Sequence, residues 1–197
     1  MSAVFAVLAI VAAIGVLVAV VLGVGGRFVP VLERARDRAA DSISERELWL
    51  AAAVAVVSTL GSLYYSEIAN FEPCRLCWYQ RIAMYPLAVI LPIAALRKDR
   101  GAWLYAAPLA AIGAVIAAYH YTIQRWPSLD SGGCSVDVPC SSAYVWRQEI
   151  GPFTIEGISI PFMALSGFLL ILVLLAADAI RSRNDRRSDN RPMEYST

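Results

Sequence analysis

Five long apolar stretches constrain this chain more than any other feature of its sequence. They cover residues 4–24, 48–69, 78–96, 103–123 and 158–177. Each holds about 20 residues, which at about 1.5 Å of helix rise per residue is enough to cross a hydrocarbon core of about 30 Å. The 197 residues are 58% hydrophobic, so no room remains for a separate soluble domain. The sequence therefore predicts an all-α, polytopic membrane protein with five transmembrane helices.

The first apolar stretch differs from a typical cleaved signal peptide. It has no basic segment before it, and it is longer than the apolar core of a usual signal peptide. Residues 1–26 are therefore predicted to be a retained transmembrane helix, additional to a four-helix bundle at 48–178. The charged segment between them, 27–47, is predicted to form a polar helix that serves as a linker. The polar tail 179–197 is predicted to be disordered.

Lysine and arginine are distributed unevenly among the connecting segments. Three lie in the short link 97–102, five in the linker 27–47 and five in the tail 179–197. The connections 70–77 and 124–157 carry only Arg75, Arg125 and Arg147. The positive-inside rule places the basic segments, including the C-terminus, in the cytoplasm and the other two connections outside a cell membrane. The formal net charge of only +1 argues against nucleic-acid binding.

All four cysteines fall in the two connections predicted to be extracytoplasmic. They form two local pairs, Cys74 with Cys77 and Cys134 with Cys140. This distribution suits an oxidising compartment, although four cysteines allow three pairings. A C-x-x-C loop is too short to stabilise a fold much by closing a loop, and its usual role is to cycle between dithiol and disulfide. A purely structural disulfide remains an alternative for Cys134 and Cys140.

A four-cysteine zinc site is a further alternative for these residues. Structural zinc sites usually combine two closely spaced pairs, with two to four residues between the ligands. The second pair here has five intervening residues, with Pro139 directly before Cys140. We therefore predict no metal at the cysteines.

Arg81 follows the C-x-x-C pair at a spacing that has chemical meaning. Pro73 suits the entry to a helix, which would place Cys77 in the first turn, where the helix dipole favours a thiolate. Arg81, four residues later, then shares a helix face with Cys77. Two interpretations remain: the arginine reaches a lipid phosphate, or it donates hydrogen bonds to a bound quinone.

Both cysteine regions resemble a known family. The stretch FEPCRLCWYQRIAMYP at 71–86, preceded by LGSLYYSEI, is similar to disulfide bond formation protein B (DsbB), in particular to its shorter Gram-positive form, BdbC. CSVDVPCSSAY at 134–144, ISIPFMALSGF at 158–168 and HYTIQ at 120–124 also match that form. The likeness covers residues 48 to about 178. The first helix and the linker depart from the four-helix pattern of the family.

The resemblance implies a quinone-dependent oxidoreductase that generates protein disulfides. A reduced extracytoplasmic oxidase of thioredoxin fold, like DsbA or BdbD, would attack the Cys134–Cys140 disulfide at Cys134. The resulting dithiol would reduce Cys74–Cys77, and Cys77 would pass electrons to ubiquinone or menaquinone, and so to the respiratory chain. Arg81 matches the quinone-site arginine of the family and would stabilise developing negative charge. His120 is the only histidine, and its similar position in the family implies a quinone-pocket role, beside the simpler interpretation of a packing residue.

Exchange between the pairs requires the second cysteine loop to move, and Gly132 and Gly133 would supply that freedom. The segment 142–150 mixes aromatic, aliphatic and charged residues, which fits a short helix on the membrane surface or a plain loop. Gly61 and Gly113 suit close contacts between helices.

Two other functions fit parts of the pattern. A vitamin K epoxide reductase-like enzyme is also a quinone-linked thiol bundle, but its C-x-x-C pair opens the last helix of the bundle, whereas here the pair opens the second of four. A non-catalytic scaffold would use both disulfides only to brace loops. It would keep its cysteines oxidised whatever the respiratory state.

Overall fold

The computed structural model describes residues 2–129, 134, 139–140, 145–150 and 153–189. Its helices are α1 (Ser2–Gly25), α2 (Pro30–Ile43), α3 (Glu47–Leu63), α4 (Arg75–Leu96), α5 (Trp103–Arg125) and α6 (Ile160–Asp189). A π-helical turn, η1 (Tyr64–Ile68), extends α3, and a 3-10 turn, η2 (Pro127–Leu129), follows α5. Two antiparallel strands, β1 (Val145–Ile150) and β2 (Phe153–Ser159), precede α6.

Five helical segments of the described chain are long and apolar enough to cross a membrane: Val4–Gly25, Glu47–Ile68, Arg75–Leu96, Trp103–Arg125 and Ile160–Asp185. The prediction of five such helices is therefore confirmed.

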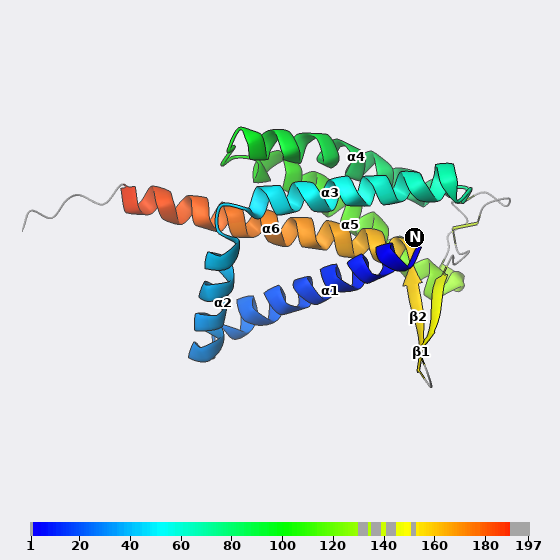
Figure 1. Ribbon diagram of the computed structural model, residues 1–197, viewed down its shortest axis with the longest axis horizontal. Coiled ribbons are helices and arrows are strands. Elements are labelled where there is room, and N and C mark those ends of the chain that lie inside the picture. Colours follow the sequence, from blue (N-terminus) through cyan, green and yellow to red (C-terminus); the bar gives the residue numbers. More distant parts are fainter. Residues whose placement is uncertain (1, 130–133, 135–138, 141–144, 151–152, 190–197) are drawn as a thin grey trace, which may run out of the picture.

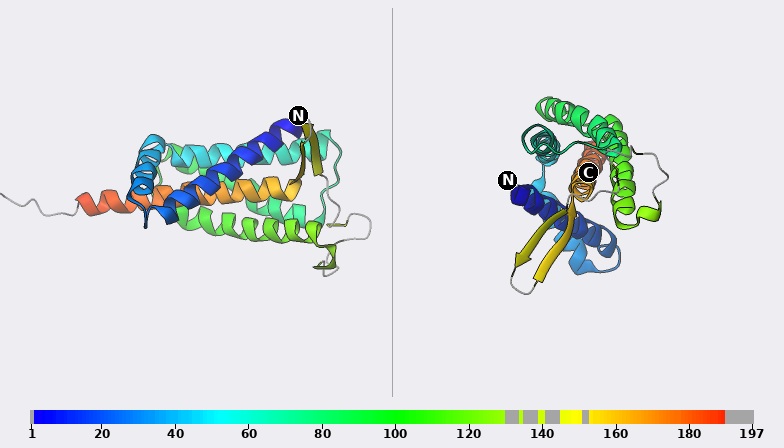
Figure 2. Two further views of the ribbon diagram at one scale, coloured as in Figure 1. Left: turned by 90° about the horizontal axis from the view of Figure 1, so that it is seen from below. Right: turned by 90° about the vertical axis from the view of Figure 1, so that its right-hand side faces the viewer.

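The helices α3, α4, α5 and α6 lie side by side as a four-helix bundle (Figure 1), in which each helix packs against its neighbours in the ring. Helix α1 packs against α6 and crosses it obliquely, with its N-terminal half beside α3 (Figure 2). Helix α2 crosses the end of the bundle at which α6 continues outward. The hairpin of β1 and β2 and the start of α1 lie together at the opposite end.

Small residues allow these helices to approach closely. The bundle core combines alanines such as Ala55 and Ala110 with Leu87, Leu91 and Phe168. A Cβ atom at Gly113 would overlap the ring of Phe168, so α5 and α6 are in contact there through glycine. In lipid, where helices gain little from the hydrophobic effect, such close packing is a main source of association. This agrees with the predicted contact role of Gly113.

Ion pairs hold the end of the bundle that is remote from the cysteines. Arg181 on α6 lies 3.0 Å from the carboxylate of Glu47 at the start of α3 and 3.8 Å from that of Asp178. Both acids are buried, so the arginine neutralises charges that would otherwise be costly. Arg100, in the link between α4 and α5, lies 3.6 Å from Asp185. These contacts extend α6 beyond its apolar part.

Two predictions need correction. Residues 145–150 are neither a surface helix nor a plain loop, because they pair with 153–159 as a hairpin. β-branched and aromatic residues in both segments, such as Val145, Trp146 and Phe153, favour strands. The prediction of disorder from residue 179 is wrong for 179–189, which continue α6. Residues 142–144 and 190–197, like Gly132 and Gly133, lie outside the described residues.

Candidate active site

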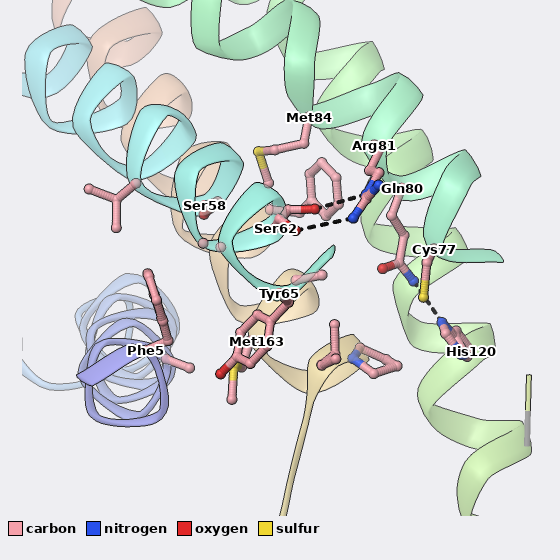
Figure 3. Close-up of a pocket in the computed structure, with 18 of the residues that line it drawn as sticks. Phe5, Ser58, Ser62, Tyr65, Cys77, Gln80, Arg81, Met84, His120 and Met163 are labelled. Carbon is pink, nitrogen blue, oxygen red and sulfur yellow. Dashed lines mark hydrogen bonds between the residues drawn. The ribbon is translucent and has the colours of Figure 1, made fainter. Parts of the chain in front are cut away.

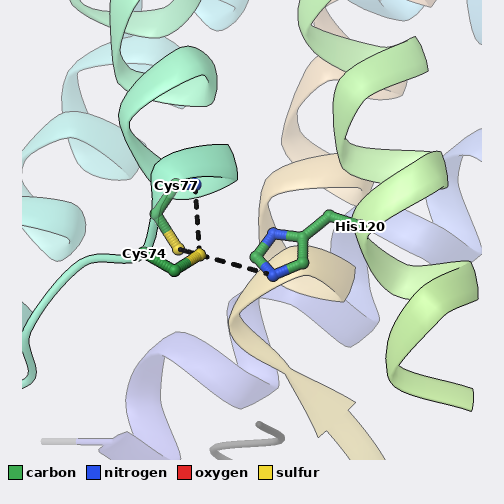
Figure 4. A group of neighbouring side chains, drawn as sticks. All are labelled: Cys74, Cys77 and His120. Atoms are coloured by element: carbon green, nitrogen blue, oxygen red, sulfur yellow. Dashed lines mark hydrogen bonds between the residues drawn. The ribbon is translucent and has the colours of Figure 1, made fainter. Parts of the chain in front are cut away.

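Cys74 and Cys77 stand at the N-terminus of α4. Cys74 is the N-cap residue, with extended backbone, and its Sγ accepts a hydrogen bond from the backbone N–H of Cys77 at 3.4 Å. Cys77 lies in the first turn, as predicted from Pro73. Both are free cysteines, and their sulfurs are 3.1 Å apart (Figure 4). The helix N-terminus therefore presents a dithiol whose two sulfurs are close enough to join with little movement.

His120 on α5 reaches this dithiol from the neighbouring helix (Figure 4). It is only 2% exposed, and its Nε2 lies 3.6 Å from Cys74 Sγ and 3.2 Å from the backbone oxygen of Cys140. Its Nδ1 lies 3.1 Å from Nε2 of Gln80. With the Gln80 amide nitrogen donating, the ring hydrogen sits on Nε2, between the sulfur and the carbonyl. The histidine thus links both cysteine regions, beyond the packing role considered from the sequence.

These contacts favour the ionised form of Cys74. The hydrogen bond with the Cys77 thiol, reinforced by the one with His120, lowers the pKa of Cys74 to about 4 from its ordinary value of 9.0, although burial opposes the shift. A thiolate at a helix N-terminus also gains from the helix dipole. The sequence favoured a thiolate at Cys77, whereas the structure places the stabilised sulfur at the N-cap, because the first-turn N–H points at Cys74.

Cys134 and Cys140 form a disulfide. Cys140 is buried, at 1% exposure, and belongs to the same buried cluster as Cys74 and Ile123 on α5. Cys77 and Cys134 pack against that cluster and are only partly buried. The structure therefore brings the two pairs together, with Cys74 toward Cys140. A disulfide cannot offer two thiolates, so the four-cysteine zinc alternative does not apply to this arrangement.

Arg81 lies one turn deeper on α4 than Cys77. It is 9% exposed, its Nε donates to the hydroxyl of Ser62 at 3.0 Å, and one terminal nitrogen donates to the Ser62 backbone oxygen at 3.1 Å (Figure 3). Its guanidinium also lies 5.1 Å from the ring centre of Trp78. No ion pair among the described residues includes Arg81. This charge is buried with only neutral partners, which is costly in an apolar environment.

A cavity of about 400 Å³ connects these groups. Cys74, Cys77, Arg81 and His120 line one end, and the remainder is mainly apolar. Its volume is within the range of small-molecule sites, and a mainly apolar wall with a few convergent polar groups is typical of them. Figure 3 shows Cys77, Gln80 and Arg81 along α4, with His120 beside them. The predicted Cys77–Arg81 face therefore opens into one cavity.

The same polar end contains a potential set of metal ligands. The ligand atoms of Cys74, Cys77 and His120 lie within 4.8 Å of one another. Two thiolates and an imidazole suit zinc, but a metal there would compete with oxidation of the two sulfurs to a disulfide.

Sequence reasoning missed several residues of the site. Ser62, which accepts hydrogen bonds from Arg81, and Gln80, which is hydrogen-bonded to His120, were not predicted as partners of those side chains. A polar glutamine one position before Arg81 in an apolar helix was the available signal for Gln80. Met84 and Tyr85, further along α4, also line the cavity. Wall residues from α1 gave no signal, because the whole of that helix is apolar.

The fold and site define a class: a multi-pass helical membrane protein built around an adjoining dithiol and disulfide. The family model for the disulfide bond formation protein DsbB matches residues 45–177. The chain belongs to the DsbB family, and is a membrane thiol–disulfide oxidoreductase of the disulfide-forming class. The family predicted from residues 48–178 is thus confirmed.

Individual relatives carry consistent names. "Probable disulfide formation protein C 1" of Bacillus anthracis is 44% identical over 131 residues, covering 66% of this chain and 88% of the relative. "Disulfide bond formation protein C" of Bacillus subtilis is 45% identical over 124 residues, covering 62% and 84%. "Probable disulfide formation protein C 2" of Bacillus anthracis is 40% identical over 144 residues, covering 73% and 98%. No solved structure matches the chain.

Proposed function

We propose that this protein reoxidises an extracytoplasmic dithiol oxidase of thioredoxin fold and passes the electrons to a membrane quinone. One observation carries the proposal: a disulfide and a dithiol pack around one buried histidine, beside a mainly apolar cavity lined by Arg81, whose contacts within the described residues are with Ser62 and Trp78. The names of the relatives, which specify disulfide formation, support the same reaction class.

The described residues fit a quinone. Hydrogen bonds within the described part of the chain use two of the five N–H groups of Arg81, so donors remain for a carbonyl oxygen. The apolar wall suits the ring and its hydrocarbon chain, and His120 and the sulfurs lie at the polar end of the cavity. A quinone bound there accepts two electrons and two protons and leaves as the quinol.

The first step takes place at the Cys134–Cys140 disulfide. Cys134 is partly exposed while Cys140 is buried, so a partner thiolate reaches the sulfur of Cys134 more easily. Attack forms a partner–Cys134 disulfide and releases Cys140 as a thiolate. The partner's second thiolate then attacks the partner sulfur that is bonded to Cys134. The partner leaves with an internal disulfide, and Cys134 is released as a thiol.

The second step is exchange between the two pairs. Cys140 lies in the same buried cluster as Cys74, so its thiolate attacks Cys74 of an oxidised Cys74–Cys77 pair and releases Cys77. Cys134 then attacks Cys140, and Cys74 leaves. Its low pKa makes Cys74 a good leaving group in this step. The products are a Cys134–Cys140 disulfide and a Cys74–Cys77 dithiol, which is the arrangement in the structure.

The third step reoxidises the dithiol. Closing the Cys74–Cys77 bond releases two electrons and two protons, counting the proton lost when Cys74 ionised. Both sulfurs line the cavity, and we assign delivery of the electrons to Cys77 because it shares a helix face with Arg81. Arg81 donates hydrogen bonds where negative charge develops, and His120 holds a proton on Nε2 at the sulfur.

Membrane orientation follows from the charges. The cysteine pairs and the start of α1 lie at one end of the bundle, and the basic link 97–102 lies at the other. We place the basic end, with α2 and the C-terminal part of α6, in the cytoplasm. The cysteine loops then face the extracytoplasmic space, where a secreted oxidase is available.

Absorbance of a soluble quinone tests this function. Purified protein in detergent would receive reduced thioredoxin-fold oxidase and either a ubiquinone or a menaquinone analogue. We expect quinone consumption by the wild type and none by Cys77→Ser or Cys134→Ser. Tyr79→Phe, which alters an exposed side chain of α4 that does not line the cavity, is the control and should retain the wild-type rate. Cysteines that resist reduction, with no consumption of either quinone, would favour the structural scaffold.

A further inference from the structure

Helix α1 lies outside the part of the chain that matches the DsbB family, yet it forms one wall of the cavity. The family match begins at residue 45. The cavity is lined on one side by Phe5, Leu8, Ala9, Val11 and Ala12 of α1. We propose that the N-terminal half of α1 builds the binding site for the hydrocarbon chain of the quinone. This proposal rests on the proposed function, which identifies the ligand.

The contact between α1 and α3 is close and specific. A Cβ atom at Gly61 would lie 2.8 Å from the ring of Phe5, so only glycine lets the ring sit against α3 without displacement. The Phe5 ring centre is 5.9 Å from that of Tyr64 and 5.8 Å from that of Tyr65. Figure 3 shows Phe5 and Tyr65 beside each other. Such ring distances are typical of favourable aromatic pairs. The glycine predicted to mediate a helix contact therefore accommodates α1.

The wall formed by α1 continues away from the cysteines. On the α3 side the cavity runs from Tyr65 to Ala53, which corresponds to about 18 Å of helix. On the α6 side it runs from Ile160 to Leu170, so the cavity follows the groove between α3 and α6. Polar lining groups are concentrated near Cys77 and Arg81, whereas the far part is aliphatic. This gradient matches a molecule with a polar ring and an apolar chain.

The N-terminal half of α1 is also the part best fixed to the bundle. Among residues 4–25 only Ala6 and Ala9 are buried, at 0% and 6% exposure, and both lie in the N-terminal half of α1. Because α1 crosses α6 obliquely, its N-terminal half covers the groove beside α3 and its C-terminal half leaves it (Figure 2). The residues of α1 that line the cavity accordingly end at Ala12, within its N-terminal half.

Two substitutions and one label test this wall. Ala9→Leu adds bulk at the groove, and Phe5→Ala removes the aromatic contact. Gly23→Leu on the same helix is the control for added bulk, because a Cβ atom added there meets no atom within 4 Å. Phe28→Ala, at an 80% exposed phenylalanine, is the control for ring removal. In parallel, wild-type protein would be photolabelled, without turnover, by a quinone carrying a reactive group on its chain.

We expect Ala9→Leu to raise KM for a long-chain quinone about tenfold, and to change KM for a chainless analogue less than about twofold, with kcat unchanged. Phe5→Ala should raise the ratio of KM for the long-chain quinone to KM for the chainless analogue by a smaller factor, while both controls match the wild type. The label should attach to residues 5–12. Labelling confined to other helices, or an unchanged KM ratio in both variants while wild type still reduces quinone, would overturn the wall and leave the proposed function intact. Wild type that reduces no quinone and labels nowhere on α1 would overturn both.

Discussion

Two arginines at opposite ends of the bundle show how differently the same side chain is used. Arg181, at the basic end, contacts the carboxylates of Glu47 and Asp178. Arg81, at the cysteine end, is buried with a serine and a tryptophan as its partners. A paired arginine holds helices together, whereas one buried among neutral groups retains attraction for a ligand that brings negative charge. The difference indicates that the basic end of the bundle contributes to stability, whereas the cysteine end carries out the reaction.

The largest effect should follow loss of the Arg81 charge. Arg81→Gln keeps a hydrogen-bond donor and removes the positive charge, so we expect kcat/KM for quinone to fall about 100-fold, similar to the loss of a donor to a developing oxyanion. Arg81→Lys should recover part of the rate. The thermal midpoint in detergent should hardly change, since no carboxylate in the described part of the chain is paired with Arg81. A stability loss larger than the activity loss would mean that Arg81 is structural like Arg181.

The reciprocal experiment is Arg181→Gln. It leaves Glu47 and Asp178 buried without their cation, and we expect a loss of about 1–3 kcal/mol of stability, less than for a fully buried pair because Arg181 is partly exposed. Denaturation in detergent measures this loss, and the double variant with Glu47→Gln should recover part of it. KM for quinone should stay at the wild-type value. A changed KM with normal stability would contradict the division between the two ends.

A smaller effect concerns the charge state of Cys74. Its pKa of about 4 means that the thiolate persists as pH falls until about that value, whereas an ordinary thiol would be protonated below about pH 8. Ultraviolet thiolate absorbance should therefore stay flat between about pH 5 and pH 8 in a dithiol protein with Cys134→Ala and Cys140→Ala. His120→Ala removes one of the stabilising contacts and should raise the midpoint. Absorbance that rises mainly above about pH 8 in both proteins would contradict a stabilised thiolate.

Sequence reasoning succeeded where the pattern was long or chemically distinctive. Twenty-residue apolar stretches fixed the five spans, and the joint pattern of both cysteine pairs with Arg81 identified the family. Short segments were less predictable. Residues 145–159 mix aromatic and charged side chains over lengths at which strand and helix patterns overlap, so the hairpin was missed.

Tertiary neighbours explain the other omissions. Helix α1 is apolar on all sides, so no periodicity marks the face that lines the cavity. Ser62 and Gln80 became site residues only when α3 and α5 were placed against α4. The extension of α6 depends on Arg181 and Asp185 finding partners on other segments, which composition alone does not show.

The most direct test of the relay is a thiol map after a single reduction. Fully oxidised protein would be mixed, without quinone, with one equivalent of reduced thioredoxin-fold oxidase. Free thiols would then be trapped with acid and an alkylating reagent and located by mass spectrometry. Transfer from one pair to the other predicts alkylated Cys74 and Cys77 with an intact Cys134–Cys140 disulfide. Alkylated Cys134 and Cys140 beside an intact Cys74–Cys77 disulfide would contradict it, because electrons would have stopped before the helix pair that faces the cavity.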